Sequence, residues 1–250
     1  MFSWLRRRRV PAIADALWLG VLARYPFLSQ WSGSELQRVR QLAAEFLATK
    51  EFHGAGGFEI TDEVALAIAA QAVLPVLNLG LSWYDDFVGI VVHRDEVIAR
   101  RTSTDEVGVI HEWDEVIAGE AMDQGPVMLN WRDVADAGNA AHAGYNVVIH
   151  EFVHKIDMRD GRADGCPPLP SSAARREWLL VMQREYASFK EQVVIAERFG
   201  GPSPWLDAYG AQSIDEFFAV ASEAYFVSAQ RFGQEFPALA SLFGGFYRRS

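Results

Sequence analysis

The sequence predicts an α+β fold, with a small sheet packed on helices, from three observations. Apolar residues recur at helical spacing in the first third, short β-branched and aromatic stretches follow within 87–131, and helical spacing returns from 145 onwards. The 250 residues, half of them hydrophobic and 22% charged, suffice for one substantial core. We therefore predict a single domain over 1–250, with a flexible basic terminus at 1–10.

Three helices are expected in the first third, where apolar residues recur three and four positions apart. Side chains able to cap a helix stand near the start of the second and the third. The predicted helices cover 12–24, 34–49 and 61–79, with Ser34 and with Thr61 or Asp62 as the N-cap candidates.

Four short segments rich in β-branched or aromatic residues come next and predict strands. They cover 87–92, 97–101, 107–111 and 126–131. We expect them to form the small sheet, with 126–131 as the edge to which an extended peptide adds as a further strand.

The remainder of the chain alternates helical segments with breaks that contain glycine and proline. A helix is predicted at 145–158, followed by a turn-rich loop at 160–170. Three more helices are predicted at 172–198, 213–229 and 234–247.

Composition argues against several classes of protein. The net charge of −10 opposes the attraction to phosphates that nucleic-acid binding requires, so we expect no nucleic-acid partner. Cys166 is the only cysteine, which rules out an intrachain disulfide and favours a reducing compartment, the cytoplasm. Residues 64–84 carry no charge, but Gln71, Pro75 and Asn78 interrupt them and the flanks are acidic, so we predict a buried segment and no membrane span.

The segment His150-Glu151-Phe152-Val153-His154 has the spacing of a zinc hydrolase. Residues i and i+4 of a helix lie about 40° apart around the axis, so both imidazoles can face one metal ion. Glu151 lies to the side of that direction, within reach of a water on the metal. Zinc lowers the pKa of such a water towards about 7, so Glu151 can take its proton and pass it to the departing amine.

A catalytic zinc ion needs a third protein ligand, and three carboxylates compete for this position. Asp160 follows His154 by six residues, but the turn that this spacing requires falls on Asp157, where a glycine is normally needed. Glu216 and Glu223 lie about 20° apart on one face of the later helix, two turns apart, so that one can bind metal while the other braces it.

The surroundings of the later carboxylates add two hypotheses. Apolar neighbours follow Glu216, and an ionised carboxylate among them is costly unless it pairs with a cation. Glu223 or Asp157 is then either solvated or part of a helix cap, or it is hydrogen-bonded to a metal-binding imidazole. Tyr209, seven residues before Glu216, is a candidate to stabilise the oxyanion of the reaction.

The chain resembles the Mlc titration factor A family of zincin-like zinc metallopeptidases. Several stretches carry the resemblance: Leu79-Gly80-Leu81-Ser82-Trp83-Tyr84, Gly125-Pro126-Val127-Met128-Leu129-Asn130-Trp131, residues 146–170, and Asp207-Ala208-Tyr209 through Glu216-Phe217-Phe218-Ala219-Val220-Ala221-Ser222-Glu223. The resemblance implies that His150, His154 and Glu216 bind one zinc ion per chain and that Tyr209 assists.

The resemblance also implies a zincin-type fold and a cytoplasmic peptidase of the aminopeptidase type, acting on peptide or protein substrates. In enteric bacteria it implies binding to the repressor Mlc, a transcription factor. Met122 departs from the family pattern, where a tryptophan is expected, and this puts specificity in more doubt than chemistry.

Two rival interpretations are weighed against the peptidase. A regulatory binding protein that sequesters a transcription factor needs zinc only for structure, and Glu151 disfavours it because a structural site does not require a base. A membrane-embedded peptidase depends on residues 64–84. Cys166, in the loop after the metal helix, is interpreted as incidental rather than as a redox or inhibitory thiol.

Overall fold

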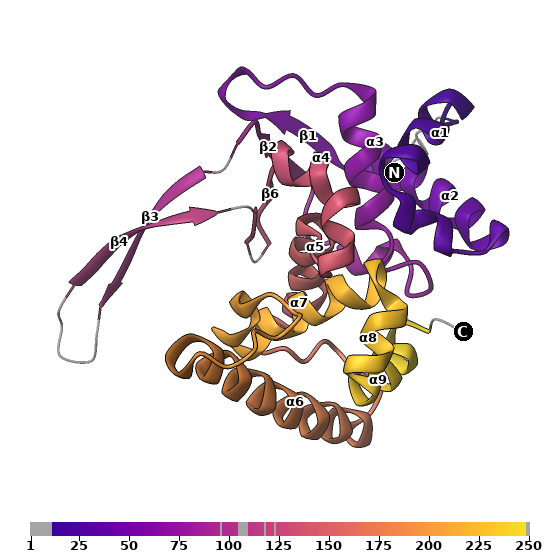
Figure 1. The fold of residues 1–250 in the computed structure, drawn as a ribbon. Helices are drawn as coiled ribbons and strands as arrows, with labels where there is room; N and C mark the ends of the chain where they lie inside the picture. Colours follow the sequence, from indigo (N-terminus) through magenta and orange to yellow (C-terminus); the bar gives the residue numbers. More distant parts are fainter. Residues whose placement is uncertain (1–11, 96, 105–109, 118, 123, 249–250) are drawn as a thin grey trace, which may run out of the picture.

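A computed structural model describes residues 12–248 except 96, 105–109, 118 and 123. The predicted basic terminus at 1–10 lies outside the described residues. Helices α1 (Asp15–Arg24), α2 (Gly33–Thr49) and α3 (Asp62–Ala72) pack together beside a small sheet, and the helices from residue 172 onwards form a second layer (Figure 1). The predicted α+β class is confirmed.

The sheet has the order β1-β2-β6-β5 among the described residues. Its strands are β1 (Glu51–Gly54), β2 (Gly89–His93), β6 (Val127–Asn130) and β5 (Gly119–Ala121). The first three run parallel, with Ile90 opposite Val127, whereas β5 runs antiparallel to β6. The prediction of 126–131 as an edge is therefore wrong: β6 is internal, and the short strand β5 stands at the end of the sheet.

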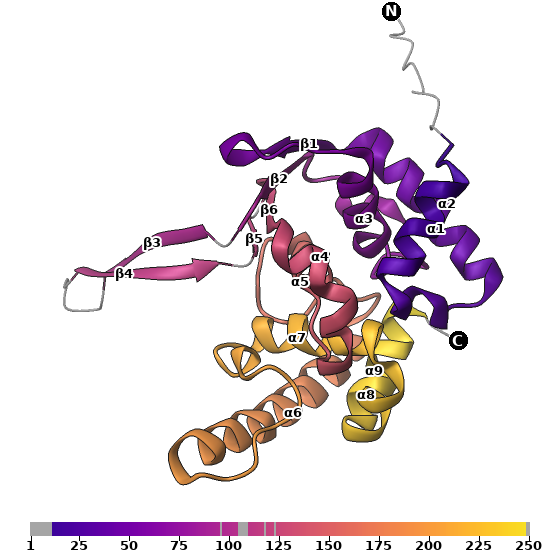
Figure 2. The ribbon, with the colours of Figure 1, turned by 45° about the horizontal axis from the view of Figure 1, so that its top comes forward.

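Strands β3 (Val97–Thr104) and β4 (Ile110–Ile117) form a separate antiparallel ribbon. Figures 1 and 2 show this ribbon extending away from the helices. Residues 107–109 of the strand predicted at 107–111 lie outside the described residues, and β4 covers its last two residues and continues to Ile117. The expectation that all four predicted strands share one sheet is wrong, because β3 and β4 pair with each other.

Helix α5 (Val147–Asp157) lies between the two layers, against β5 and β6 on one side and α7 (Ile214–Val227) on the other. Around α7 pack α6 (Ser172–Phe199), α8 (Ala229–Glu235) and α9 (Pro237–Tyr247). Aromatic clusters stabilise both layers. Phe152 of α5 packs among Phe46, Tyr84 and Phe87, and Phe218 of α7 packs against Trp178 and Phe243.

Several predicted boundaries shift for local reasons. The N-cap of α2 is Ser32 rather than Ser34, because Ser32 and Glu35 form a capping box. Thr61 caps α3 as predicted, but the helix ends at Ala72 and not at 79, since Pro75 disfavours helix before it. Of the helices in the described part of the chain, none has the length and apolar character that crossing a bilayer requires.

Sequence patterns also missed α4 (Trp131–Ala140), which begins directly where β6 ends. Its N-cap is Asn130, the last residue of that strand, whose side-chain oxygen accepts a hydrogen bond of 2.8 Å from the backbone N–H of Asp133. Asn130 is thus both the last residue of β6 and the N-cap of α4. The strand predicted at 126–131 extends one residue beyond the end of β6.

Candidate metal centre

Helix α5 carries the polar residues of the motif on one side and its packed aromatic residue on another. Asn146 caps the helix by accepting a hydrogen bond of 2.9 Å from the backbone N–H of Ile149. Phe152 is fully buried in the layer that contains the sheet, whereas His150, Glu151 and His154 line a pocket of about 440 Å³. The helical period therefore separates the packing face from the chemical face.

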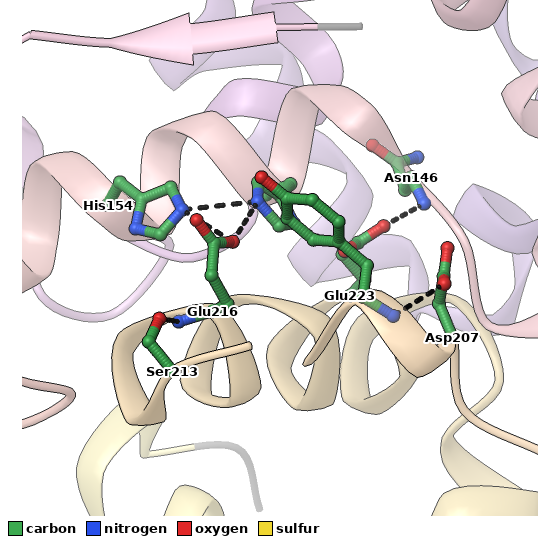
Figure 3. Close-up of polar contacts among 8 residues, drawn as sticks. Asn146, His154, Asp207, Ser213, Glu216 and Glu223 are labelled. Atoms are coloured by element: carbon green, nitrogen blue, oxygen red, sulfur yellow. Dashed lines mark hydrogen bonds and ion pairs between the residues drawn. The ribbon is translucent and has the colours of Figure 1, made fainter. Parts of the chain in front are cut away.

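Helix α7 brings Glu216 to the same pocket. Ser213 caps this helix at the backbone N–H of Glu216, which fixes the first turn directly below α5 (Figure 3). The following residues, 217–227, are buried, so α7 is held on nearly all sides. Packing of α5 on α7 thus joins residues that are 62 positions apart.

Three donor atoms converge between the two helices. Glu216 Oε2 lies 3.0 Å from His150 Nε2 and 3.3 Å from His154 Nε2, and the two imidazole nitrogens are 3.1 Å apart. The side chains are 11%, 12% and 18% exposed, in the order His150, His154 and Glu216. The carboxylate and the imidazoles thus share one small, partly covered space.

These separations fit a metal ion. Donor atoms bound to one tetrahedral zinc at about 2.0–2.1 Å stand roughly 3.3 Å from each other. The observed separations of 3.0, 3.1 and 3.3 Å are close to this value. Two imidazoles and one carboxylate form the only group of this kind found among the described histidine, cysteine and acidic residues, and it can hold a metal ion.

Glu223 braces His150 from the other side. Its Oε1 lies 2.7 Å from His150 Nδ1, and its Oε2 accepts a hydrogen bond from the backbone N–H of Asn146 (Figure 3). The Asn146 side chain in turn donates to Gln71 of α3 over 2.8 Å. This buried chain orients the His150 ring so that Nε2 points towards Glu216.

The charges of the centre are strongly coupled. Burial opposes ionisation of Glu216, but the two imidazoles outweigh it and lower the pKa of its carboxyl well below the usual range. Burial likewise opposes protonation of His150, yet Glu223 and Glu216 raise the pKa of that imidazole well above its ordinary value. The site is thus built to hold positive charge beside Glu216.

Glu151 lies beneath strand β5. Burial raises the pKa of its carboxyl to about 7. A methyl group added at Gly119 of β5 would come within 2.5 Å of its Oε1, so glycine is needed for the strand to lie this close. The Glu151 carboxylate is therefore confined between α5 and strand β5 at the end of the sheet.

Tyr209 stands at the pocket rim in a short 3-10 helix, Ala208–Ala211. The Asp207 side chain accepts a hydrogen bond of 2.9 Å from the Tyr209 backbone N–H, which opens this turn. Gly210 packs tightly on α7, because an added methyl would lie 3.3 Å from Val220. The Tyr209 ring centroid is 6.0 Å from that of His150, and the residue is 39% exposed.

The remaining candidates lie outside this cluster. Asp160 is exposed, and it is not part of the group of donor atoms. Asp157 is buried, and its Oδ2 accepts a hydrogen bond of 2.8 Å from the backbone N–H of Gly165. Of the two carboxylates that were candidates for a hydrogen bond to an imidazole, Glu223 forms this bond, with His150. Cys166 is buried outside the pocket lining, and burial raises the pKa of its thiol to about 11.

Comparison with known proteins places the chain in a family. The model of the glucose-regulated metallo-peptidase M90 family matches residues 2–248. The chain belongs to this family. The resemblance predicted from the sequence is thereby confirmed.

Curated relatives of this M90 chain carry the name Mlc titration factor A. The protein of Edwardsiella ictaluri (strain 93-146) is 34% identical over 250 residues, which cover 100% of this chain and 94% of that protein. The protein of Salmonella arizonae is 33% identical over 251 residues, covering 100% and 97%. The protein of Klebsiella pneumoniae (strain ATCC 700721 / MGH 78578) is 34% identical over 237 residues, covering 94% and 87%.

Two features around this pocket escaped the sequence patterns. Gly119 belongs to a strand of three residues, too short to show alternation, and its closeness to Glu151 is a contact between distant segments. Lys155, directly after the motif, is fully buried although lysine is usually exposed. The available signal is its place four residues after Glu151, on the side of the predicted helix that carries the motif carboxylate.

Proposed function

We propose that this chain is a zinc-dependent peptidase of the aminopeptidase type, with His150, His154 and Glu216 as metal ligands and Glu151 as the general base. The observation that carries the proposal is the convergence of three donor atoms within 3.0–3.3 Å, in the pocket that Glu151 also lines. Membership of a metallopeptidase family supports it.

Zinc suits this donor set better than a harder cation, because two of the three ligands are imidazoles. When bound, zinc supplies a Lewis acid that polarises the scissile carbonyl and lowers the pKa of a water molecule. Glu223 keeps His150 in the tautomer that leaves Nε2 free to bind metal.

The residues of the chain move the protons. Glu151 removes a proton from the attacking water and delivers it to the amine that leaves, so it acts first as base and then as acid. Tyr209 donates a hydrogen bond from its phenol to the oxyanion that develops on the substrate carbonyl. Its position on the pocket rim, beside the His150 ring, supports this role.

The charge of the pocket supports action at a free amino terminus. No lysine or arginine is among its described lining residues. Six carboxylates line it: Glu120, Glu151, Asp207, Asp215, Glu216 and Glu223. A positively charged α-amino group is attracted to such a site. Strand β5, at the end of the sheet and on the pocket lining, replaces 126–131 as the edge to which we propose that an extended peptide adds.

Replacement of Glu151 by glutamine tests the peptidase. The variant keeps the shape of the side chain but lacks the base, so we expect about one zinc ion per chain and a fall in kcat of about 10³-fold or more. Metal content by elemental analysis and cleavage of amino acid arylamides and short peptides are measured on both proteins. Full activity in Glu151→Gln would overturn the assignment of the base.

A second candidate is a regulatory binding protein that sequesters a transcriptional repressor with little turnover. The observation that favours it is the name of the relatives, Mlc titration factor A, which refers to titration of Mlc. Binding of a purified repressor of this type, measured by calorimetry with wild type and Glu151→Gln, separates the two functions. Tight binding by a zinc-loaded wild type that cleaves no peptide favours the second candidate.

We also propose a cytoplasmic location. The single cysteine, Cys166, is buried and forms no disulfide, which suits a reducing compartment. Fractionation of the native host with an antibody against the chain tests this location.

A further inference from the structure

A buried lysine links the metal helix to the edge strand. Lys155 follows His154 directly and is 0% exposed. Its ammonium group donates hydrogen bonds to the backbone carbonyls of Met122 and Gly125, the latter over 2.9 Å, and lies 4.7 Å from the ring centroid of Phe87. A buried charge is costly unless such bonds compensate it, so this lysine has a specific reason to be there.

The two carbonyls belong to the turn that joins β5 to β6. Met122 comes directly after β5, and its backbone N–H donates to Pro126 over 3.4 Å while its carbonyl accepts from Gly125 over 3.1 Å. Gln124 has a φ of 51°, a left-handed conformation that is unfavourable for a residue other than glycine. The turn is therefore strained, and the ammonium group holds the carbonyls on both sides of Gln124.

The strand also meets α5 at its other end. Gly119, the first residue of β5, lies against Glu151, as the 2.5 Å approach of an added methyl to Oε1 indicates. Glu151 and Lys155 are four residues apart, and hence on the same face of α5. Helix α5 thus fixes its distance from β5 at two points, through Glu151 at the start of the strand and through Lys155 at its end.

We propose that Lys155 is a positioning residue, which holds strand β5 at the distance from the metal centre that productive binding of an extended peptide requires. This inference rests on the proposed peptidase function. A peptide that adds to β5 exchanges backbone hydrogen bonds with it, so a displaced strand loses more binding for a long peptide than for a substrate that reaches only the metal centre.

Lys50 offers a matched control. Its ammonium group donates to the backbone carbonyls of Tyr84 and Phe87 and lies 3.9 Å from the centroid of the same Phe87 ring. Burial lowers the pKa of this amine to about 8. Lys50 therefore makes the same kind of contact in the same layer, but its carbonyl partners belong to 84–87 and not to the β5–β6 turn.

The test compares Lys155→Met with Lys50→Met in the zinc-loaded full chain. For an extended peptide we expect Lys155→Met to raise KM by at least about tenfold, whereas KM for a single-residue arylamide changes less than about threefold. Lys50→Met should leave both KM values unchanged. Equal kinetic constants for the two variants, or an equal rise for both substrates, would overturn the proposal.

Hydrogen exchange supplies a readout that does not depend on activity. In Lys155→Met the backbone amides of 119–127 should exchange at least about tenfold faster than in the wild type, and in Lys50→Met they should not. Unchanged exchange in this segment would contradict the proposal, whether or not the wild type cleaves peptides. A wild type that cleaves nothing would count against the proposed peptidase alone. If Lys155→Met does not fold, Lys155→Gln, which retains a donor, should show the same changes to a smaller extent.

Discussion

The two sides of the pocket are built in different ways. On the helical side, His150 contacts both Glu216 and Glu223, and two capped helices fix the positions of these residues. On the strand side, β5 has three residues and pairs in the described chain with β6 alone. The difference separates metal binding from recognition: changes to the three donor residues or to Glu223 on the helical side should affect metal binding, whereas changes on the strand side should affect turnover and substrate binding while sparing the metal.

Removal of the metal should have the largest effect. Dialysis against a zinc chelator should abolish peptidase activity and lower the unfolding temperature, because a ligand that binds only the folded state stabilises it. Added zinc should restore both. Activity that survives complete metal removal, verified by elemental analysis, would contradict the role assigned to the helical side.

Gly119→Ala should give the next largest effect, on the strand side. The added methyl must displace the Glu151 carboxylate or the strand, so we expect kcat to fall by about a hundredfold. Zinc content should stay at about one ion per chain. Gly89→Ala on β2 is the control, since a methyl there has an ordinary 3.4 Å contact with Pro126. Loss of zinc in Gly119→Ala would remove the distinction between the two sides.

Glu223→Gln should weaken metal binding by about 10- to 100-fold, because the partner of His150 Nδ1 loses its charge. Competition with a chromogenic chelator measures the affinity. Asp157→Asn is the matched control, a buried carboxylate whose hydrogen bond goes to the Gly165 backbone instead. If both variants weaken zinc to the same degree, general electrostatics rather than the imidazole contact explains the effect.

Tyr209→Phe should have the smallest effect, a fall in kcat of about tenfold with unchanged zinc affinity. Water can partly replace the phenol, because Tyr209 is 39% exposed. Steady-state kinetics on an arylamide substrate measures the change. This variant sharpens the comparison, since Tyr209 packs on the helical side but is not expected to bind metal.

The helical side was largely predictable from the sequence. The spacing of His150 and His154 follows from the helical period, and the helix itself is indicated by its apolar residues. The choice among the later carboxylates required more, because Glu216 and Glu223 share one face of α7. Packing of α7 on α5 decides which of them faces both imidazoles, and spacing alone does not contain this information.

The strand side could not be predicted in the same way. Strand β1 has four residues and β5 has three, so neither shows a readable alternation. The pattern of 126–131 predicts an edge because β5, which pairs with β6, has only three residues and is too short to be recognised as a strand. The helix α4 was hidden by Asn130, which belongs to a strand and caps a helix. The prediction of one domain over 1–250 stays a prediction.

Metal analysis of wild type and Glu216→Ala, paired with peptidase assays on both, tests the central claim most directly. We predict about one zinc ion per chain and activity in the wild type, and loss of both in the variant, because Glu216 supplies the third donor atom at 3.0 and 3.3 Å from the imidazole nitrogens. Zinc bound to Glu216→Ala with wild-type affinity, or a wild type that binds no zinc and stays inactive when zinc is added, would contradict it.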